Sequence, residues 1–396
     1  MSDETKASAT VSDYLRWRGD LTLAQDGFNE VDNLLLCIIS YIKLENIPRL
    51  RSFDPQDAMP MGDVCRLLTE EDEQLGLSTL DYIPLMRQAA ETPRFREVSL
   101  FAFESLHDED RQMQFAAVSF LLPDGSVYAA YRGTDMTIVG WQEDFNMSFL
   151  SAVPAQVKAA EYAGAVARAC PRRALRIGGH SKGGNLAAWA AVHLDEKLQR
   201  QRLIAAYNND GPGFSRDLVD TPSYQAVADR LFTYIPASSI VGVLLEHAED
   251  YEVVDSTARS IMQHEPLSWC VEGPRFVHLG QRSQLGQLSD GVLREWIGSM
   301  SPREREQFSR AFFDILSRGG RTKTLEDLRS GGLAAGAALI REYAGADEEK
   351  KKIISEIFRR LAVDVKDELM KAAGAGVRRA GETILATGQA IADLRK

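Results

Sequence analysis

A serine enclosed by glycines, Gly179-His180-Ser181-Lys182-Gly183, constrains the fold of this chain more than any other stretch. The run ALRI before it has the apolar character of a short strand, and NLAAWAAVHL after it is typical of a helix with small residues in its first turns. Glycines on both sides of the serine allow a sharp turn and a close approach of helix to strand. The pattern predicts a strand–turn–helix unit that exposes the Ser181 hydroxyl at its bend.

Short apolar runs on both sides of this unit predict a sheet. FREVSLFAFES, MQFAAVSFLL and VYAAYRG precede it, and QRLIAAYNND, RLFTYIPAS, YEVVDS and SWCVEG follow it. Asp124-Gly125 is a hairpin signal between two of these runs. Helical stretches at Ala155–Ala169 and Asn185–Arg200 separate several of the others. Strands that alternate with helices predict an α/β fold with a largely parallel sheet covered on both faces.

The ends of the chain differ from this pattern. Asn29 to Leu44 predicts a strongly apolar helix capped by Asn29 or Asp32. After about residue 290 the strand signals stop, and helical spacing continues at Leu293–Met300, Pro302–Arg318, Leu333–Tyr343 and Glu348–Leu394. We therefore expect an α/β domain with a helical lead-in over residues 1–290 and a helical region over 291–396.

Composition excludes several classes of protein. The formal charge of −11 argues against nucleic-acid binding. Four scattered cysteines without metal-ligand spacing predict buried free thiols in a reducing compartment: Cys37, Cys65, Cys170 and Cys270. The N-terminal residues lack the apolar segment of a signal peptide, and the apolar run LLLCIISYI spans about half of the ~20 residues that a membrane helix needs. We expect a cytoplasmic protein without a transmembrane segment.

A serine becomes a good nucleophile when a base accepts its proton and a third group orients that base. We expect the three groups in the chain order serine, acid, histidine. His107 and His180 precede the serine and are therefore set aside, and His180 is only the variable position of the motif. Four histidines follow it: His193, His247, His264 and His278. His264 lies in a connection after the strand-like run YEVVDS, where such a base belongs, so it is the predicted base. His247 is the alternative.

The acid of such a triad has several candidates. Asp210 ends the strand-like run LIAAYNND, which places its carboxylate at the carboxyl edge of the sheet, where α/β proteins put their sites. Asp255 is a rival from a later strand, and Glu246 and Asp250 stay open. We predict Asp210 as the acid, although the run Asn-Asn-Asp-Gly-Pro-Gly also fits a capped turn.

An oxyanion hole needs backbone N–H donors that face the developing negative charge. Lys182 directly follows the serine, so its N–H is the first predicted donor. Thr134, in the loop after the strand at residues 127–131, offers both its N–H and its hydroxyl. Thr134 and Lys182 are therefore the predicted oxyanion donors.

Several motifs resemble those of a known family. AAYRGTD, WQED and GGHSKGGNLA are similar to the core motifs of class 3 lipases, a branch of the α/β-hydrolases. More closely, the chain resembles a group of bacterial lipase-like proteins at Asp13–Leu21, Gly179–Ala187, Asn208–Phe214 and Ser256–Trp269. The resemblance covers roughly residues 10–320. It implies an α/β-hydrolase fold with Ser181 as nucleophile, His264 as base, and Thr134 and Lys182 as oxyanion donors.

One departure from the resemblance concerns the acid. Class 3 lipases carry it after the strand that matches FTYIP, where this chain has Ala237-Ser238-Ser239. Either the acid has moved one strand earlier, to Asp210, or the triad is incomplete. The resemblance also implies a lid at residues 136–150, for which a buried amphipathic helix with Trp141 in the core is an equal alternative.

Two functions remain open. The first is a serine hydrolase that cleaves lipid or other acyl esters, a substrate class implied by the resemblance, through an acyl-enzyme on Ser181. The second is a hydrolase-like scaffold with an inactive site and a partner-binding helical tail. Phosphate-loop and nicotinamide fingerprints are missing from the sequence, so we expect no cofactor and no metal. Residues 320–396 are expected either to pack as an appendage or to contact a protein partner or membrane surface.

Overall fold

The computed structural model describes residues 8–69, 82–135, 137–283, 286–287, 296–317, 343–357 and 359. The chain divides into two compact units. The first comprises Met1–Asp108, Met113–Thr134 and Pro154–Arg282, and the second comprises Glu109–Gln112, Asp135–Val153 and Ser283–Lys396. The predicted domain boundary near residue 290 stays a prediction.

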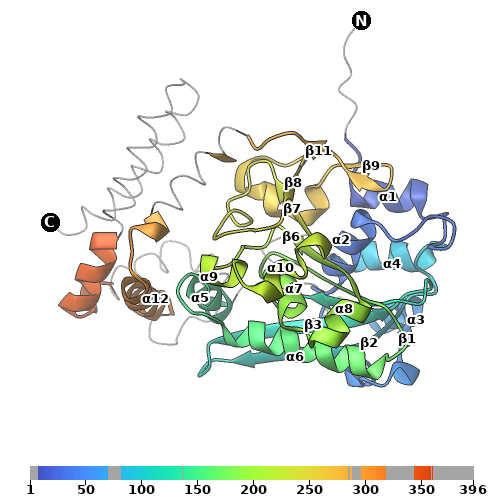
Figure 1. The fold of residues 1–396 in the computed structure, drawn as a ribbon, viewed down its shortest axis with the longest axis horizontal. Helices are drawn as coiled ribbons and strands as arrows, with labels where there is room; N and C mark the ends of the chain where they lie inside the picture. Colours follow the sequence, from blue (N-terminus) through green and yellow to red (C-terminus); the bar gives the residue numbers. More distant parts are fainter. Residues whose placement is uncertain are drawn as a thin grey trace, which may run out of the picture. The chain divides into compact units, whose positions relative to one another are not determined.

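A nine-stranded sheet forms the centre of the first unit, in the order β1-β2-β3-β4-β5-β6-β7-β8-β11 (Figure 1). The strands are β1 (Met59–Pro60), β2 (Ser99–Asp108), β3 (Met113–Leu121), β4 (Val127–Tyr131), β5 (Leu175–His180), β6 (Leu203–Asn209), β7 (Leu231–Pro236), β8 (Tyr251–Val254) and β11 (His278–Leu279). Strands β4 to β8 pair in parallel, whereas β1 to β4 and the β8–β11 pair are antiparallel. This mixed, mostly parallel sheet flanked by helices confirms the predicted α/β-hydrolase-like fold.

The first unit also contains α-helices. They are α1 (Val11–Arg18), α2 (Glu30–Ile39), α3 (Met61–Leu67), α4 (Ile83–Glu91), α6 (Pro154–Ala169), α7 (Lys182–His193), α8 (Glu196–Arg202), α9 (Arg216–Val219) and α10 (Pro222–Gln225). Short 3-10 turns add η1 (Pro48–Arg51), η2 (Pro55–Asp57), η4 (Ala228–Arg230), η5 (Ser260–His264) and η6 (Pro266–Ser268). Helices α6 and α7 lie side by side (Figure 1). The predicted hairpin is confirmed, since Gly125 has a positive φ of 83° between the antiparallel strands β3 and β4.

Helices α2 and α7 cover opposite faces of the sheet at β5. A Cβ atom on Gly178 would lie 2.8 Å from the side-chain oxygen of Asn33 in α2, whereas one on Gly179 would lie 2.1 Å from the main chain of Gly183 in α7. Successive residues of a strand point to opposite faces, so each glycine admits one helix. The centre of the sheet is therefore packed closely on both sides.

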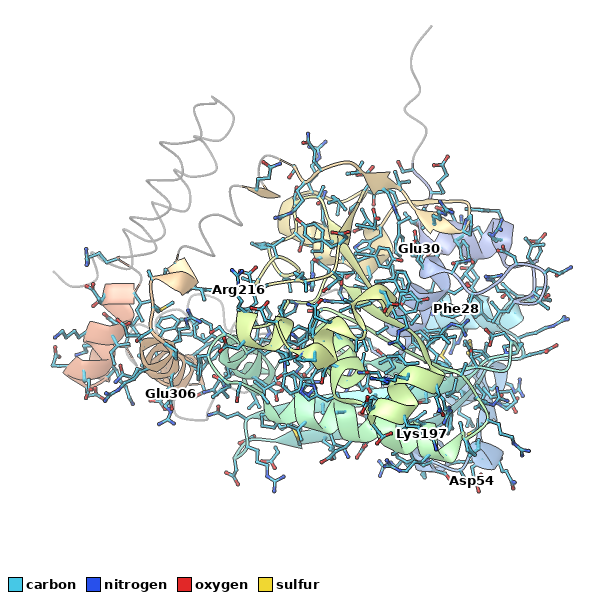
Figure 2. The ribbon with its side chains drawn as sticks, in the orientation of Figure 1. Phe28, Glu30, Asp54, Lys197, Arg216 and Glu306 are labelled. Atoms are coloured by element: carbon cyan, nitrogen blue, oxygen red, sulfur yellow. The ribbon has the colours of Figure 1, made fainter. Side chains whose placement is uncertain are left out.

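Aromatic side chains fill the sheet face covered by α2. Phe28, labelled in Figure 2, precedes α2, and its ring centroid lies 5.7 Å from that of Tyr128 in β4 and 6.1 Å from that of Tyr207 in β6. The guanidinium of Arg176 lies 4.6 Å from the centroid of Phe28, which is a cation–π contact. The lead-in to α2 thus packs against the core. All four cysteines are buried and free of disulfides, as predicted.

Three sequence predictions differ from the structure. The predicted helix Asn185–Arg200 is two helices, because Asp195 caps α8 by accepting the N–H of Lys197 and ends α7 before it. The predicted strand SWCVEG contributes only β9 (Val271–Glu272), which pairs with β10 (Arg275–Phe276) outside the main sheet. This segment pairs with the N-terminal residues instead, since Val271 donates its N–H to the carbonyl oxygen of Ala9. Helix α2 ends at Ile39 rather than Leu44, with Asn29 as its cap.

The second unit contains helical segments. Helix α5 (Ile138–Asn146) lies within the segment predicted as a lid, and α12 (Pro302–Ser317) matches the predicted helix Pro302–Arg318. Residues 348–357 are helical, as predicted for the start of Glu348–Leu394. An apolar cluster of Phe308, Ala311, Ile354 and Ile357, with Phe145 packed against it, joins these helices. Of the predicted helix Leu293–Met300, residues 296–298 are helical, and residues 293–295 lie outside the described residues, as do most of Leu333–Tyr343 and of the tail at 320–396.

The described part of the chain contains no candidate for a membrane-spanning helix. None of its helices combines the length and the apolar character that crossing a membrane would need.

A buried ion pair fixes the lead-in to the core. The guanidinium of Arg94 donates to both carboxylate oxygens of Asp32 in α2, at 2.7 and 2.5 Å, and both side chains are fully buried. It also donates to the carbonyl oxygens of Leu21, Asp26 and Gly27. Arg94 therefore satisfies the buried carboxylate and orders the loop before α2.

We expect Arg94→Met to lower the free energy of unfolding by about 3–5 kcal/mol, because it leaves the carboxylate of Asp32 buried without a countercharge. Urea unfolding followed by circular dichroism measures this change. The matched control is Arg200→Met, which removes an exposed pair with Glu196 and should change stability by less than about 0.5 kcal/mol. Equal effects of the two variants would contradict a structural role for the buried pair.

Candidate active site

Ser181 occupies the bend between β5 and α7. Its backbone has φ 59° and ψ −133°, a strained conformation for a residue with a side chain. The Ser181 N–H donates to the carbonyl oxygen of Asn209 at 2.9 Å, and the Ser181 carbonyl oxygen accepts from the N–H of Gly184 at 2.9 Å. The side chain is half-buried. The predicted strand–turn–helix unit is present at the predicted residues.

The loop after β4 packs directly against this bend. A Cβ atom on Gly133 would lie 2.7 Å from the carbonyl oxygen of His180 and 3.1 Å from Cβ of Ser181. A Cβ atom on Gly183 would lie 2.1 Å from the carbonyl oxygen of Tyr131, at the end of β4. Glycine at both positions lets the loop that carries Thr134 approach the serine. Thr134 itself is buried.

His264 and Asp210, far apart in the sequence, form a hydrogen-bonded pair. Nδ1 of His264, at the end of η5, lies 2.6 Å from Oδ2 of Asp210, just after β6. The Asp210 side chain is fully buried, and its Oδ1 accepts the N–H of Gly242 at 3.1 Å. Because a carboxylate accepts and Nδ1 donates, the neutral ring leaves Nε2 as its proton acceptor.

The His264 ring lies close to the bend. Its centroid is 4.6 Å from that of His180, the residue directly before Ser181. Consecutive Cα atoms are about 3.8 Å apart, so the imidazole lies near the backbone of the bend. The structure therefore pairs the predicted base with the predicted acid and places the His264 ring beside the residue that precedes Ser181.

The alternative residues have other hydrogen-bond partners or are exposed. His247 has both ring nitrogens in hydrogen bonds, Nδ1 with Glu249 at 3.1 Å and Nε2 with the carbonyl oxygen of Gly242 at 2.7 Å. His193 stacks on Trp189, and His278 hydrogen-bonds Glu30 at 2.8 Å. Among the rival acids, the Asp255 carboxylate accepts the N–H of Ser256 at 2.8 Å, Glu246 pairs through its backbone with Phe214, and Asp250 is exposed.

His180, which sequence reasoning set aside, connects the parts of the site. Its Nε2 lies 2.8 Å from the carbonyl oxygen of His264, and its Nδ1 lies 3.0 Å from the hydroxyl of Tyr41. Burial, with a smaller contribution from the charge of His264, holds the pKa of His180 well below its usual value, so the ring is neutral at pH 7. Because a carbonyl oxygen only accepts, Nε2 carries the proton and Nδ1 accepts from Tyr41.

Lys182 is a buried lysine at the first position of α7. Its Nζ donates to the carbonyl oxygen and to Oε1 of Gln114, at 2.8 and 2.6 Å. Gln114 in turn donates from Nε2 to the carbonyl oxygen of Gly133 at 3.5 Å. The Lys182 backbone N–H belongs to the first turn of the helix, where N–H groups lack intrahelical acceptors and favour negative charge. Its side chain thus connects α7 to the loop that carries Thr134.

Comparison with known proteins places the chain in a family. A family model described as Mbeg1-like matches residues 89–314, more than half of the chain. The chain belongs to the Mbeg1-like family. The matched range of this Mbeg1-like chain includes Ser181, Asp210, His264 and the loop that carries Thr134. Its sequence finds no match among curated proteins.

Two solved lipase structures are similar to this Mbeg1-like chain at low identity. The M37 lipase is 15% identical, with a TM-score of 0.34, and the match covers 55% of this chain and 70% of the lipase. The Lip2 lipase from Yarrowia lipolytica is 14% identical, with a TM-score of 0.34, and the match covers 63% of this chain and 91% of the lipase.

The low pKa of His180 predicts a pH-dependent contribution to stability. The unfolded chain binds a proton at His180 near pH 6.5, whereas the folded chain does not until a much lower pH. Below about pH 6.5 the unfolded state therefore binds a proton that the folded state excludes, and the free energy of unfolding decreases as the pH is lowered. We expect the stability of His180→Gln to decline less steeply than that of the wild type between pH 6.5 and 5, measured by urea unfolding.

The control for this comparison is His193→Gln, which replaces an exposed histidine and should keep the wild-type slope. Parallel curves for His180→Gln and the wild type would contradict a neutral, buried imidazole at residue 180.

Proposed function

We propose that this chain is a serine hydrolase that cleaves carboxylic esters, of lipids or other acyl compounds, through an acyl-enzyme on Ser181. One observation carries the proposal: the buried Asp210 carboxylate lies 2.6 Å from Nδ1 of His264, whose ring centroid is 4.6 Å from that of His180, directly before the strained Ser181. An acid, a base and a serine at a sharp bend are the parts that activate a hydroxyl for attack on a carbonyl.

The chemistry follows from the roles these groups take. Asp210 accepts the Nδ1–H of His264 and so keeps Nε2 free to take the Ser181 proton as Oγ attacks the ester carbonyl. Negative charge develops on the carbonyl oxygen, which the N–H groups of Lys182 and Thr134 stabilise. His264 then gives its proton to the leaving alcohol, and the acyl group stays on Ser181. The same imidazole then takes a proton from water as the water oxygen attacks the acyl-enzyme. The carboxylic acid product leaves, and the imidazole returns the proton to Oγ of Ser181.

The position of the acid supports this proposal. Asp210 follows β6, one strand before the position at which the resembled lipases carry their acid. At that later position, Ala237-Ser238-Ser239 follow β7 and provide no carboxylate. We propose that Asp210 supplies the missing carboxylate, so the departure from the lipase pattern is a relocation of the acid.

The missing carboxylate at residues 237–239 also fits a second function. A scaffold with an inactive site and a partner-binding tail would also lack a carboxylate at residues 237–239. The hydrogen bond between Asp210 and His264 favours the hydrolase. A lid at residues 136–150, contact of residues 320–396 with a protein partner or membrane surface, and a cytoplasmic location belong to the proposal as predictions.

Covalent labelling tests the proposal. We expect a fluorophosphonate to label the wild type and not Ser181→Ala, because the reagent reacts with an activated serine. His264→Gln should abolish labelling almost fully, and Asp210→Asn should slow it by about 10²- to 10⁴-fold, because the ring then loses its orienting acceptor. Labelling is measured by intact mass spectrometry over time, with hydrolysis of p-nitrophenyl esters of graded acyl length as a second readout.

The matched control is Ser215→Ala, which replaces an exposed serine outside the site and should label at the wild-type rate. A wild-type protein that resists every fluorophosphonate tried would refute the hydrolase and favour the scaffold.

A further inference from the structure

The carboxylate of Asp210 is oriented by two contacts, one on each oxygen. Oδ2 contacts Nδ1 of His264, and Oδ1 accepts the N–H of Gly242 at 3.1 Å. The side chain is fully buried. The direction in which Asp210 holds the imidazole therefore depends on where the Gly242 peptide lies.

The Gly242 peptide is in turn fixed from its carbonyl side. Nε2 of His247 donates to the Gly242 carbonyl oxygen at 2.7 Å. On the other side, a Cβ atom on Gly242 would lie 2.4 Å from Oδ1 of Asp210 and 3.1 Å from the Ile235 side chain. The peptide is thus confined between the imidazole of His247 and the carboxylate that it orients.

His247 is itself held by a buried carboxylate. Its Nδ1 lies 3.1 Å from Oε1 of Glu249, and the two side chains are 4% and 2% exposed. Glu249 accepts two further hydrogen bonds of 2.6 Å, from the hydroxyl of Thr233 to Oε1 and from that of Tyr224 to Oε2. Both ring nitrogens of His247 therefore face acceptors, Nδ1 the Glu249 carboxylate and Nε2 the Gly242 carbonyl oxygen.

The charge state of Glu249 agrees with this pairing. Burial raises the pKa of Glu249, but the hydrogen bond and charge of His247, together with the hydroxyls of Thr233 and Tyr224, lower it below its usual value overall. A buried ion pair costs desolvation free energy, and well-packed apolar residues in its place often give equal or greater stability. A pair with every polar atom satisfied, one peptide away from Asp210, therefore calls for a role beyond packing.

We propose that His247, supported by Glu249, is a positioning residue that holds the Asp210 carboxylate through the Gly242 peptide and so aligns His264. The proposal rests on the hydrolase function proposed above. It also gives a role to the segment after β7. Where the resembled lipases carry their acid, this chain carries the loop that orients an acid one strand earlier.

The test compares two replacements of His247. Glutamine keeps an N–H for the Gly242 carbonyl oxygen but cannot act as a base, whereas alanine provides neither. We expect His247→Ala to lower kcat for p-nitrophenyl ester hydrolysis by about 10- to 100-fold with KM changed less than about twofold, because a small misplacement of a catalytic group costs rate rather than binding. His247→Gln should return kcat to within about threefold of the wild type.

The matched control is His193→Ala, which removes an exposed histidine on α7 and should leave kcat unchanged. If His247→Gln is as inactive as His264→Gln, His247 is itself the base and the positioning role is wrong. If His247→Ala keeps the wild-type kcat, Gly242 needs no support and the proposal is also wrong.

A readout independent of turnover separates this proposal from the hydrolase function. The proton between His264 Nδ1 and Asp210 should give a downfield proton resonance, assigned by its loss in Asp210→Asn. We expect this resonance to shift or broaden in His247→Ala and to keep its position in His247→Gln. A wild-type protein without esterase activity would refute the hydrolase, and the resonance would still decide the positioning role. An unchanged resonance in His247→Ala would overturn it.

Discussion

Close contact between β5 and α7 is the constraint on which the rest of the site depends. A side chain at Gly179 would collide with the main chain of Gly183, and one at Gly183 would collide with the carbonyl oxygen of Tyr131 in β4, so the helix can begin directly after Ser181 only because both are glycines. This contact forces Ser181 into a strained backbone conformation at the edge of the sheet. The strain is sustained because α2 and α7 hold β5 from opposite faces.

Around that bend, segments from distant parts of the sequence are joined by few hydrogen bonds. His180 joins the bend to the loop of His264, Lys182 and Gln114 join α7 to the loop of Thr134, and Gly242 joins Asp210 to the segment after β7. Each connection uses a buried polar group with a specific partner. Such networks are costly to leave incomplete, so they fix one arrangement of the loops.

The sequence predicts most clearly those features that local patterns determine. Glycine spacing predicts the bend at Ser181, and Asp124-Gly125 predicts the hairpin. Asp195, the cap that divides the predicted helix Asn185–Arg200, is also a local signal, because aspartate is a preferred N-cap residue. Other features depend on non-local contacts that a linear pattern does not contain. The backbone pairing of Val271 with Ala9 and the bridging role of His180 are of this kind. Chain order made Asp210 and His264 candidates, and the fold brings them to 2.6 Å.

The central claim is that one point in space faces the Ser181 hydroxyl, the His264 imidazole and two backbone N–H groups. A crystal structure of the protein after reaction with a fluorophosphonate tests this most directly. The account predicts phosphorus bonded to Oγ of Ser181, with the phosphoryl oxygen about 2.7–3.1 Å from the backbone nitrogens of Lys182 and Thr134 and with Nε2 of His264 within hydrogen-bonding reach. Phosphorus on another residue, or a phosphoryl oxygen turned away from both nitrogens, would contradict it.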